Sequence, residues 1–242
     1  MTVMEVAAAR PGRVSIEWAR QAWGELEGLA LLRAALTGPL AGRFAMVSSF
    51  GAESAVLLDM VATVDRRTPV IFLDTGKLFP ETLAYRDTLV AWLGLEDVRS
   101  IRPEPEDLAR HDPDGSLWQS EPDMCCHIRK TEPLDRALAG FVGWINGRKR
   151  FQGGTRASLP SLETDPVTGQ LKLNPLAGWS LEDVRTYRRL RQLPLHPLVA
   201  RGYPSIGCLP CTRPAAASEP VRAGRWWQLD KSECGIHRGE GI

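Results

Sequence analysis

Residues 44–54, with the sequence FAMVSSFGAES, decide the fold of this chain. Their apolar start predicts a short buried strand, and residues 54–64 predict a helix because apolar side chains recur there at helical spacing. Small residues in the turn between them let a ligand approach the backbone, and the free amides of a helix N-terminus attract anions. The turn therefore indicates an anion-binding loop, although an ordinary serine-capped turn has the same pattern. The residues concerned are Ser48, Ser49, Gly51 and Ser54.

A second strand–turn–helix unit follows directly. Residues 69–73 predict another buried strand, and Pro80 begins a helix over 80–93 at a position where its missing amide costs little. The turn between them holds Asp74, Thr75 and Gly76. Because open α/β sheets bind ligands at the carboxyl ends of their strands, both turns are expected to line one crevice. The alternative for this second turn is an ordinary turn signal followed by a solvated lysine, Lys77.

The pattern beyond residue 93 continues this alternation of strands and helices. Strands are predicted over 98–101 and 141–146, with a further candidate at 171–176. A helix over 180–193 begins with a capping box. Such alternation predicts an α/β fold with a parallel sheet and right-handed crossovers.

The composition along the chain suggests three segments. A helical lead-in over 1–40, capped by Ser15, precedes an α/β domain over 41–225. Within this domain, the Pro- and Asp-rich residues 102–124 predict an irregular surface excursion. The C-terminal tail, 226–242, is expected to be mobile because chain termini move unless they are tied down.

Charge and hydropathy exclude several classes of protein. The 242 residues include 30 Lys and Arg against 29 Asp and Glu, a net charge of +1, so no overall basic footprint for nucleic acid is present. No apolar run approaches the roughly 20 residues that span a bilayer, and the N-terminus has no signal-peptide pattern. We therefore expect a cytoplasmic protein with neither a nucleic-acid nor a membrane partner.

Four of the five cysteines form two short pairs. Cys125 and Cys126 are adjacent, and Cys208 and Cys211 form a C-x-x-C pair. In a reducing compartment such pairs bind an iron–sulfur cluster or a tetrahedral zinc ion more often than they form disulfides. Adjacent residues on a helix point about 100° apart, which favours a cluster with separated iron corners. Four buried structural thiols are the alternative.

The fifth cysteine, Cys234, is followed by eight residues and lies between Lys231 and His237. Positive neighbours favour a thiolate, and a thiol on a mobile tail suits a shuttling nucleophile. An incidental surface cysteine is the alternative.

Basic residues concentrate near these features. A ligand with several negative groups needs such local neutralisation, and arginine clamps phosphate or sulfate oxygens in pairs. Some of these side chains are expected to be merely solvated. The basic residues are Lys130, Arg148, Lys149, Arg150, Arg156, Arg213, Arg222 and Arg225.

Together these stretches resemble a known family. Residues 72–82, the basic loop 144–150, the segment 202–213 and the terminal 231–237 are similar to motifs of the assimilatory sulfonucleotide reductases, in particular the thioredoxin-dependent adenylyl-sulfate (APS) reductases. The resemblance implies an adenine-nucleotide-binding fold of the ATP pyrophosphatase type. It also implies reduction of APS to sulfite and AMP in sulfate assimilation and cysteine biosynthesis.

The resemblance further implies roles for all five cysteines. It assigns one 4Fe-4S cluster per chain to Cys125, Cys126, Cys208 and Cys211, without electron transfer from the cluster to substrate. It assigns to Cys234 the attack on the sulfur of APS, which forms an S-sulfocysteine from which thioredoxin releases sulfite.

Substrate contacts are expected from both turns and from basic side chains, because thiolate attack on a sulfuryl group brings negative charges together and nearby cations stabilise them. Lys130 is also expected to couple the cluster to the substrate. Phe151 and Gly153, on either side of Gln152, depart from the acidic residue and serine common in the family, which leaves the contacts of this loop open. The expected contacts are Ser48, Ser49, Gly51, Ser54, Asp74, Thr75, Gly76, Lys130, Lys149, Arg156, Arg222, Arg225 and His237.

Three other functions stay open. The nearest is reduction of the 3′-phosphorylated substrate PAPS, alone or together with APS, although enzymes restricted to PAPS usually lack the four cluster cysteines. The others are a nucleotide-binding iron–sulfur or zinc regulator, which would not need Cys234, and an ATP-dependent adenylating enzyme on the same fold. Residues 1–40 are a candidate contact for a second subunit in a homo-oligomer.

Overall fold

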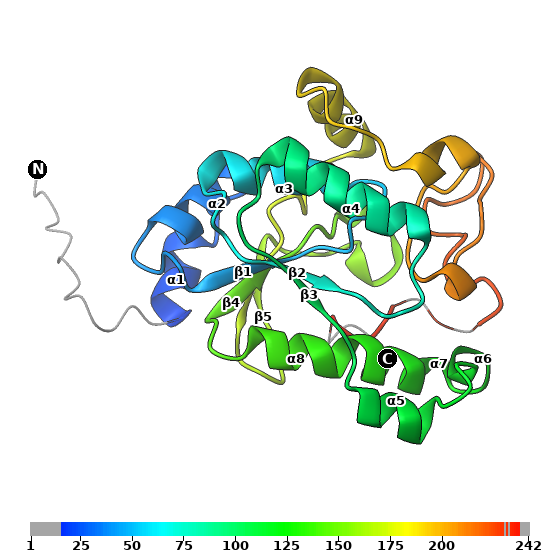
Figure 1. Ribbon diagram of the computed structural model, residues 1–242. Coiled ribbons are helices and arrows are strands. Elements are labelled where there is room, and N and C mark those ends of the chain that lie inside the picture. Colours follow the sequence, from blue (N-terminus) through cyan, green and yellow to red (C-terminus); the bar gives the residue numbers. More distant parts are fainter. Residues whose placement is uncertain (1–15, 230, 232, 238–242) are drawn as a thin grey trace, which may run out of the picture.

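A six-stranded sheet forms the centre of the molecule (Figure 1). The computed structural model describes residues 16–229, 231 and 233–237. The strand order is β3-β2-β1-β4-β6-β5, and all neighbours are parallel except β5, which runs antiparallel to β6. The strands are β1 (Phe44–Val47), β2 (Val70–Leu73), β3 (Val98–Ile101), β4 (Gly143–Ile145), β5 (Leu162–Thr164) and β6 (Leu171–Leu173).

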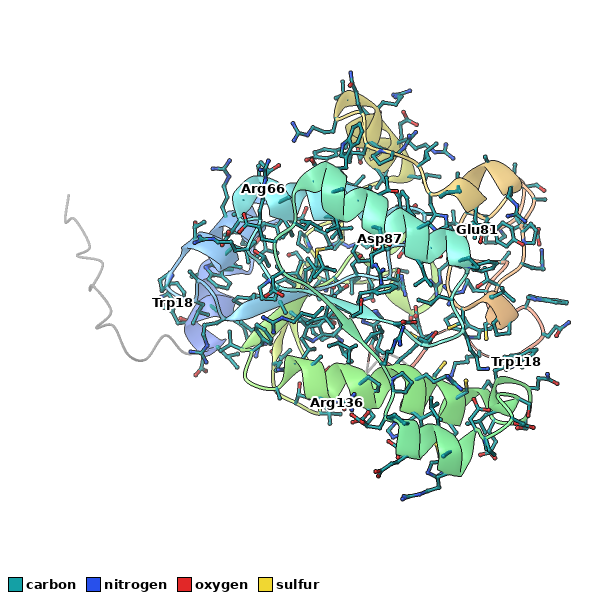
Figure 2. All side chains as sticks on the ribbon, viewed as in Figure 1. Trp18, Arg66, Glu81, Asp87, Trp118 and Arg136 are labelled. Atoms are coloured by element: carbon teal, nitrogen blue, oxygen red, sulfur yellow. The ribbon has the colours of Figure 1, made fainter. Side chains whose placement is uncertain are left out.

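Helices cover both faces of the sheet, and side chains fill the space between the layers (Figures 1 and 2). One layer contains α2, α3 and α4, and the other contains α8 with the short helices that precede it. The helices are α1 (Ile16–Trp23), α2 (Gly28–Thr37), α3 (Ser54–Val64), α4 (Pro80–Leu93), α5 (Pro105–His111), α6 (Leu117–Ser120), α7 (Pro122–Cys126), α8 (Glu132–Leu138) and α9 (Leu181–Leu190). A π-helix, His127–Thr131, joins α7 to α8, and short 3-10 helices span Arg150–Gln152, Gly154–Arg156, Pro197–Arg201 and Leu209–Cys211.

The core has two parts because side chains of a strand alternate between its faces. Phe44 and Met46 of β1 point into the larger cluster, which contains α1 to α4 and Val184 of α9. Ala45 points the other way, into a smaller cluster with Leu134 and Trp144. Both faces of the central strand are therefore buried, as expected for a parallel sheet between two helical layers.

The α/β fold with a parallel sheet is confirmed. Five strands lie where the sequence predicts them, and α3 and α4 have the predicted bounds. The capping box of α9 is also confirmed, because Ser180 Oγ accepts a hydrogen bond from the amide of Asp183 at 3.1 Å and Asp183 Oδ2 accepts one from the amide of Ser180 at 2.8 Å. These elements are set by local patterns, so the sequence suffices to find them.

Other elements differ from the expectation. Residues 102–124 contain the short helices α5, α6 and part of α7. Pro105 and Pro122 each lie in the first turn of one of these helices, a position that proline favours. The lead-in forms two helices, separated at residues 24–27, and its predicted cap Ser15 lies outside the described residues. The antiparallel strand β5 was not predicted. Among the described residues no helix has the length and apolarity needed to cross a membrane.

Candidate active site

One pocket lies at the carboxyl ends of β1, β2 and β4, and two other segments close it. One segment runs from Pro204 to Cys208, and the other contributes lining residues at 221–226 and 233–237. Most of the predicted substrate contacts line this pocket, whereas Asp74 and Gly76 do not. The predicted residues that line it are Ser48, Ser49, Gly51, Ser54, Thr75, Lys130, Lys149, Arg156, Cys208, Arg222, Arg225, Cys234 and His237.

The turn after β1 is held by its own serine side chains. Ser48 Oγ accepts a hydrogen bond from the amide of Phe50 at 3.2 Å, and Ser54 Oγ accepts one from the amide of Gly51 at 2.8 Å. Phe50 has a left-handed backbone (φ 47°), and its buried ring packs edge-on against Phe72 at 5.4 Å. Because core packing holds this unusual conformation in place, the loop is shaped before any ligand binds.

The residues of the turn after β2 have two roles, since two of them stabilise the turn and one faces the pocket. Asp74 Oδ2 accepts a hydrogen bond from Arg102 Nε at 2.9 Å, and Asp74 Oδ1 accepts one from the amide of Gly76 at 3.2 Å. Gly76 has a φ of 69°, which favours glycine. Thr75 faces the other way, with its Oγ1 3.3 Å from Cys208 Sγ. Asp74 and Gly76 therefore shape the turn, and Thr75 faces the pocket.

The C-x-x-C pair lies beside this turn, and Cys208 is within electrostatic range of Cys125 and Cys126. Leu78 forms a β-bridge with Cys208, and the amide of Leu209 donates to the carbonyl of Lys77 at 2.8 Å, which brings the C-x-x-C segment against the turn. Electrostatic effects connect the thiols: burial raises the pKa of Cys125, and charges at Cys208 and Cys211 raise it further. All four are free thiols. Within the described parts of the chain, no three His, Cys, Asp or Glu side chains form a group suited to a metal ion.

Two neighbouring basic residues of the π-helix, Arg129 and Lys130, lie in different surroundings. Arg129 is buried, pairs with Asp112 and donates to the carbonyl of Thr75 at 2.8 Å, so it supports the turn after β2. Lys130 lines the pocket. Burial alone would lower the pKa of Lys130, but charges at Cys208 and Cys234 raise it above its usual value. Lys130 therefore lies within electrostatic range of both the cysteine group and the fifth cysteine.

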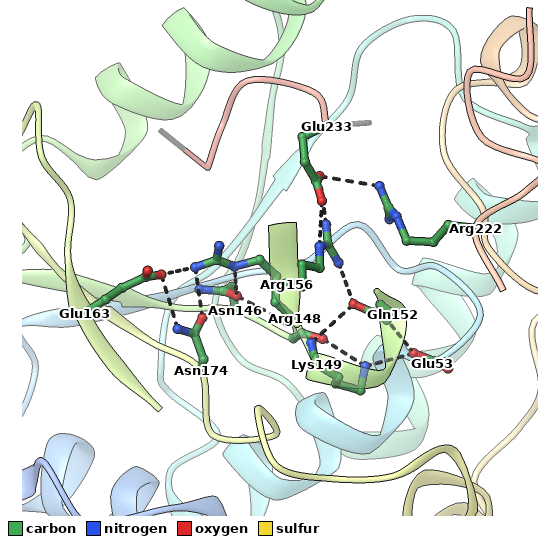
Figure 3. Close-up of polar contacts among 11 residues, drawn as sticks. Glu53, Asn146, Arg148, Lys149, Gln152, Arg156, Glu163, Asn174, Arg222 and Glu233 are labelled. Atoms are coloured by element: carbon green, nitrogen blue, oxygen red, sulfur yellow. Dashed lines mark hydrogen bonds and ion pairs between the residues drawn. The ribbon is translucent and has the colours of Figure 1, made fainter. Parts of the chain in front are cut away.

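The basic loop after β4 contributes three cations to the pocket lining, each with an acidic partner (Figure 3): Arg148, Lys149 and Arg156. Lys149 Nζ donates to Glu53 Oε2 at 2.9 Å, and Gln152 Nε2 donates to the same oxygen at 3.1 Å. Arg156 pairs with Glu233 through two hydrogen bonds of 2.6 and 2.8 Å. Sequence reasoning missed both glutamates because their partners are 96 and 77 residues away.

Arg148 has a different environment from its neighbour Lys149. Its guanidinium is buried and contacts Asn146, Asn174 and Glu163, which joins β4 to β5 and β6 (Figure 3). The buried Arg148 network therefore supports the floor of the pocket.

The C-terminal segment lies against the pocket. Cys234 lines it and is half-buried. The ring of His237 stacks on Trp144, with centroids 5.5 Å apart and planes 14° from parallel. Burial, and then the cations Arg148 and Arg156, hold the pKa of His237 well below its usual value, so the ring is neutral at pH 7.

Two further arginines complete the cationic wall. The guanidinium of Arg225 lies 4.3 Å from the ring centroid of Trp226 and packs so closely on Gly207 that a Cβ there would lie 2.3 Å from it. Arg222 pairs with Glu233 at 3.4 Å. Burial and the nearby charge of Arg156 lower the pKa of Arg222 to about 10, which leaves it charged at neutral pH.

The fold and the site define a class of protein. A mostly parallel α/β sheet with a cation-lined pocket at the carboxyl ends of its strands is suited to an anionic nucleotide. Residues 43–214 match the phosphoadenosine phosphosulfate reductase domain, and the chain belongs to this family. The predicted family resemblance is therefore confirmed.

Relatives and a solved structure agree with this assignment. The chain is 52% identical, over 89% of its length and 84% of the relative, to an adenosine 5′-phosphosulfate reductase of Mesorhizobium japonicum. It is 40% identical, over 93% of its length and 94% of the relative, to a phosphoadenosine 5′-phosphosulfate reductase of Gloeobacter violaceus. The crystal structure of phosphoadenylyl-sulfate reductase from Candida auris has a TM-score of 0.68 at 27% identity, covering 83% of this chain and 98% of that one.

Proposed function

We propose that this protein reduces adenylyl sulfate to sulfite and AMP in sulfate assimilation and cysteine biosynthesis. The observation that carries the proposal is the position of Cys234 in the same cation-rich pocket as both strand-end turns. The high identity to a relative named adenosine 5′-phosphosulfate reductase supports APS as the substrate. A binding protein without turnover would have no use for a thiol at this place.

The first chemical step is attack of the Cys234 thiolate on the sulfate sulfur. A bond forms between Cys234 Sγ and that sulfur, the bond from sulfur to the bridging oxygen breaks, and AMP leaves with the electron pair. Two anions approach each other in this step, so cations aimed at the site lower its barrier. The cations that line the pocket are Lys130, Arg148, Lys149, Arg156, Arg222 and Arg225.

The second step needs a dithiol reductant, which we propose to be thioredoxin. One reductant thiolate attacks Cys234 Sγ, and sulfite leaves with the electrons of the sulfur–sulfur bond. The second thiol then closes the reductant's disulfide and returns the Cys234 thiolate. The dithiol supplies both electrons, so the chain needs no redox change of its own.

Intact-protein mass spectrometry under anaerobic conditions tests the mechanism. Incubation with APS and no reductant should add the mass of one sulfonate group, which thioredoxin removes. Cys234→Ser should show no adduct, whereas a parallel sample with PAPS measures the substrate range. An intact, nucleotide-binding wild-type protein without an adduct would overturn the proposed mechanism.

The second candidate substrate is PAPS. The Gloeobacter relative, which is named for that activity, is 40% identical over most of both chains. An adduct with PAPS at a rate similar to that with APS would assign dual use, and an adduct with PAPS alone would replace APS as the substrate.

We also propose a 4Fe-4S cluster on Cys125, Cys126, Cys208 and Cys211. The two pairs of free thiols lie within electrostatic range of one another, and Cys126 lies within that range of Lys130. Four thiolates are the usual ligands of such a cluster. When bound, the cluster would supply negative charge next to Lys130. Iron and acid-labile sulfide should be equimolar, near four per chain by that stoichiometry, and Cys208→Ser should lose both.

The remaining proposals concern the cell and the assembly. We propose that the protein works in the cytoplasm, where free thiols persist. We keep the three-part division at residues 40 and 225, and a homo-oligomer through the N-terminal residues, as proposals. Light scattering of the full chain and of a chain without residues 1–15 tests the assembly.

A further inference from the structure

Glu233, which directly precedes Cys234, is the acidic partner of two pocket cations (Figure 3). Its Oε1 accepts a hydrogen bond from Arg156 Nε at 2.6 Å, and its Oε2 accepts one from Arg156 Nη2 at 2.8 Å. Arg222 Nη2 lies 3.4 Å from the same Oε2. The Glu233 side chain is 10% exposed and that of Arg156 is 8% exposed, so water screens this pair weakly.

The Glu233 carboxyl is ionised at neutral pH. Burial alone would raise the pKa of Glu233, but the hydrogen bonds from Arg156 and the charge of Arg222 hold it below its usual range. A bidentate pair between a guanidinium and a carboxylate fixes both distance and orientation. The backbone of residue 233 is thereby tied to the basic loop after β4.

We propose that Glu233 is the positioning residue that docks the C-terminal segment on Arg156 and Arg222 and so holds Cys234 Sγ at the sulfate of the bound substrate. The proposal rests on the proposed function, because it assumes that Cys234 is the nucleophile.

The other contacts of the segment are made with different elements of the fold. Lys231 pairs with Asp123 of α7, and Ile236 packs in the smaller core cluster beside Leu134 and Trp144. These contacts hold the segment against α7, α8 and β4. Among the described contacts of residues 231–237, Glu233 supplies the ion pairs to the basic loop and to Arg222, so its loss should leave Cys234 docked on one side alone.

A competing role predicts the opposite kinetics. If Glu233 occupied the place of a substrate anion, its removal would lower KM and leave kcat unchanged or higher. Both roles use the same ion pairs of Glu233 with Arg156 and Arg222, so the kinetics distinguish them. A positioning role predicts a lower kcat with a small change in KM.

The test compares wild type with Glu233→Gln, which keeps the size and removes the charge. We expect the single-turnover rate of adduct formation at saturating APS to fall about tenfold to hundredfold, because a misplacement of about 1 Å has an effect of that order. We expect KM to change by less than about threefold. Glu233→Asp, which keeps the charge on a shorter stem, should recover part of the rate.

Glu219→Gln is the matched control. Glu219 lies in the same part of the chain and pairs with Arg213 at 2.8 Å, away from the pocket. This variant should retain the wild-type rate. If Glu233→Gln also retains it, or lowers KM alone, the positioning role is wrong.

Alkylation of Cys234 without substrate gives a readout that does not depend on catalysis. Peptide mass spectrometry should show faster iodoacetamide labelling of Cys234 in Glu233→Gln than in wild type or Glu219→Gln. If wild type forms no adduct, the proposed function fails, whereas faster labelling would still support docking by Glu233. Equal labelling in all three proteins would overturn the docking.

Discussion

The two sides of the pocket are held by different kinds of contact. In the turn after β1, bonds between residues two and three positions apart hold Ser48, Phe50, Gly51 and Ser54. The C-terminal segment is held by distant partners, such as Arg156, which is 77 residues from Glu233. The turn is therefore held by short-range bonds at the end of a strand, whereas the C-terminal segment is held by residues far away in the sequence.

This difference fits a reaction with a covalent intermediate. In the proposed reaction the turns bind the nucleotide, and rigidity is useful there, since a preformed loop loses little entropy on binding. In that reaction the C-terminal segment would first hold Cys234 in the pocket and then present the modified thiol to a reductant, so contacts that separate without breaking the core are useful there. Four variants test this comparison, from the largest expected effect to the smallest.

Cys234→Ser should abolish turnover, which needs the C-terminal segment, and leave nucleotide binding by the turns unchanged. Turnover should fall on the order of 10⁴-fold or more, because removal of a nucleophile has effects of that size or larger. Binding of AMP, which depends on the strand-end turns, should stay within about threefold of wild type by calorimetry. Loss of AMP binding would show that the tail and the turns are one unit.

Arg156→Ala should damage both sides at once. It removes a pocket cation and the partner of Glu233, so we expect kcat/KM to fall about 10²- to 10³-fold in steady-state assays. Arg150→Ala in the same loop removes a side chain that is 45% exposed and should stay near wild type. Equal effects of the two variants would contradict a specific role for Arg156.

The pH dependence should reside in the C-terminal segment. The pKa of docked His237 is far below its usual value, so below about pH 6.5 an undocked ring takes up a proton that the docked ring does not. The equilibrium constant for docking of this segment is therefore highest above about pH 6.5. It falls as the pH falls, by at most about tenfold per pH unit.

His237→Phe keeps a ring against Trp144 and cannot titrate. The ratio of wild-type to variant kcat should therefore decrease as the pH is lowered from 7.5 to 5.5. A ratio that stays constant over this range would mean that His237 does not control docking.

Ser54→Ala should have the smallest effect. It removes the acceptor for the amide of Gly51, a bond whose loss costs about 1 kcal/mol, so AMP affinity should fall about fivefold with kcat nearly unchanged. Isothermal titration measures the affinity. A larger loss in kcat than in affinity would show that the turn also positions the reacting groups.

Much of the fold could be predicted because it depends on local patterns. The buried runs of β1 and β2 and the helices α3 and α4 each follow from apolar spacing within a few residues. The π-helix at 127–131 and the strand β5 could not be predicted, because both are short and depend on what packs against them.

The sequence allowed most of the residues of the site to be predicted, but their positions around the pocket could be predicted only in part. The pocket brings together most of the side chains that motifs had indicated, and it leaves out Asp74, which instead holds its own turn with Arg102. Arg129 and Lys130 are neighbours in sequence, yet one supports a turn from inside the protein and the other lines the pocket. Nothing in their spacing distinguishes the two.

By itself, the sequence determined the strands and helices of the nucleotide-binding half, the charged groups available and the cysteines able to react. Those properties depend on residue type and on short-range spacing. The tertiary structure alone decided that Glu53 pairs with Lys149 and Glu233 with Arg156, which places Cys234 at the pocket. Charge pairing acts over a few ångströms in space, and only the folded chain brings residues so far apart in sequence within that range.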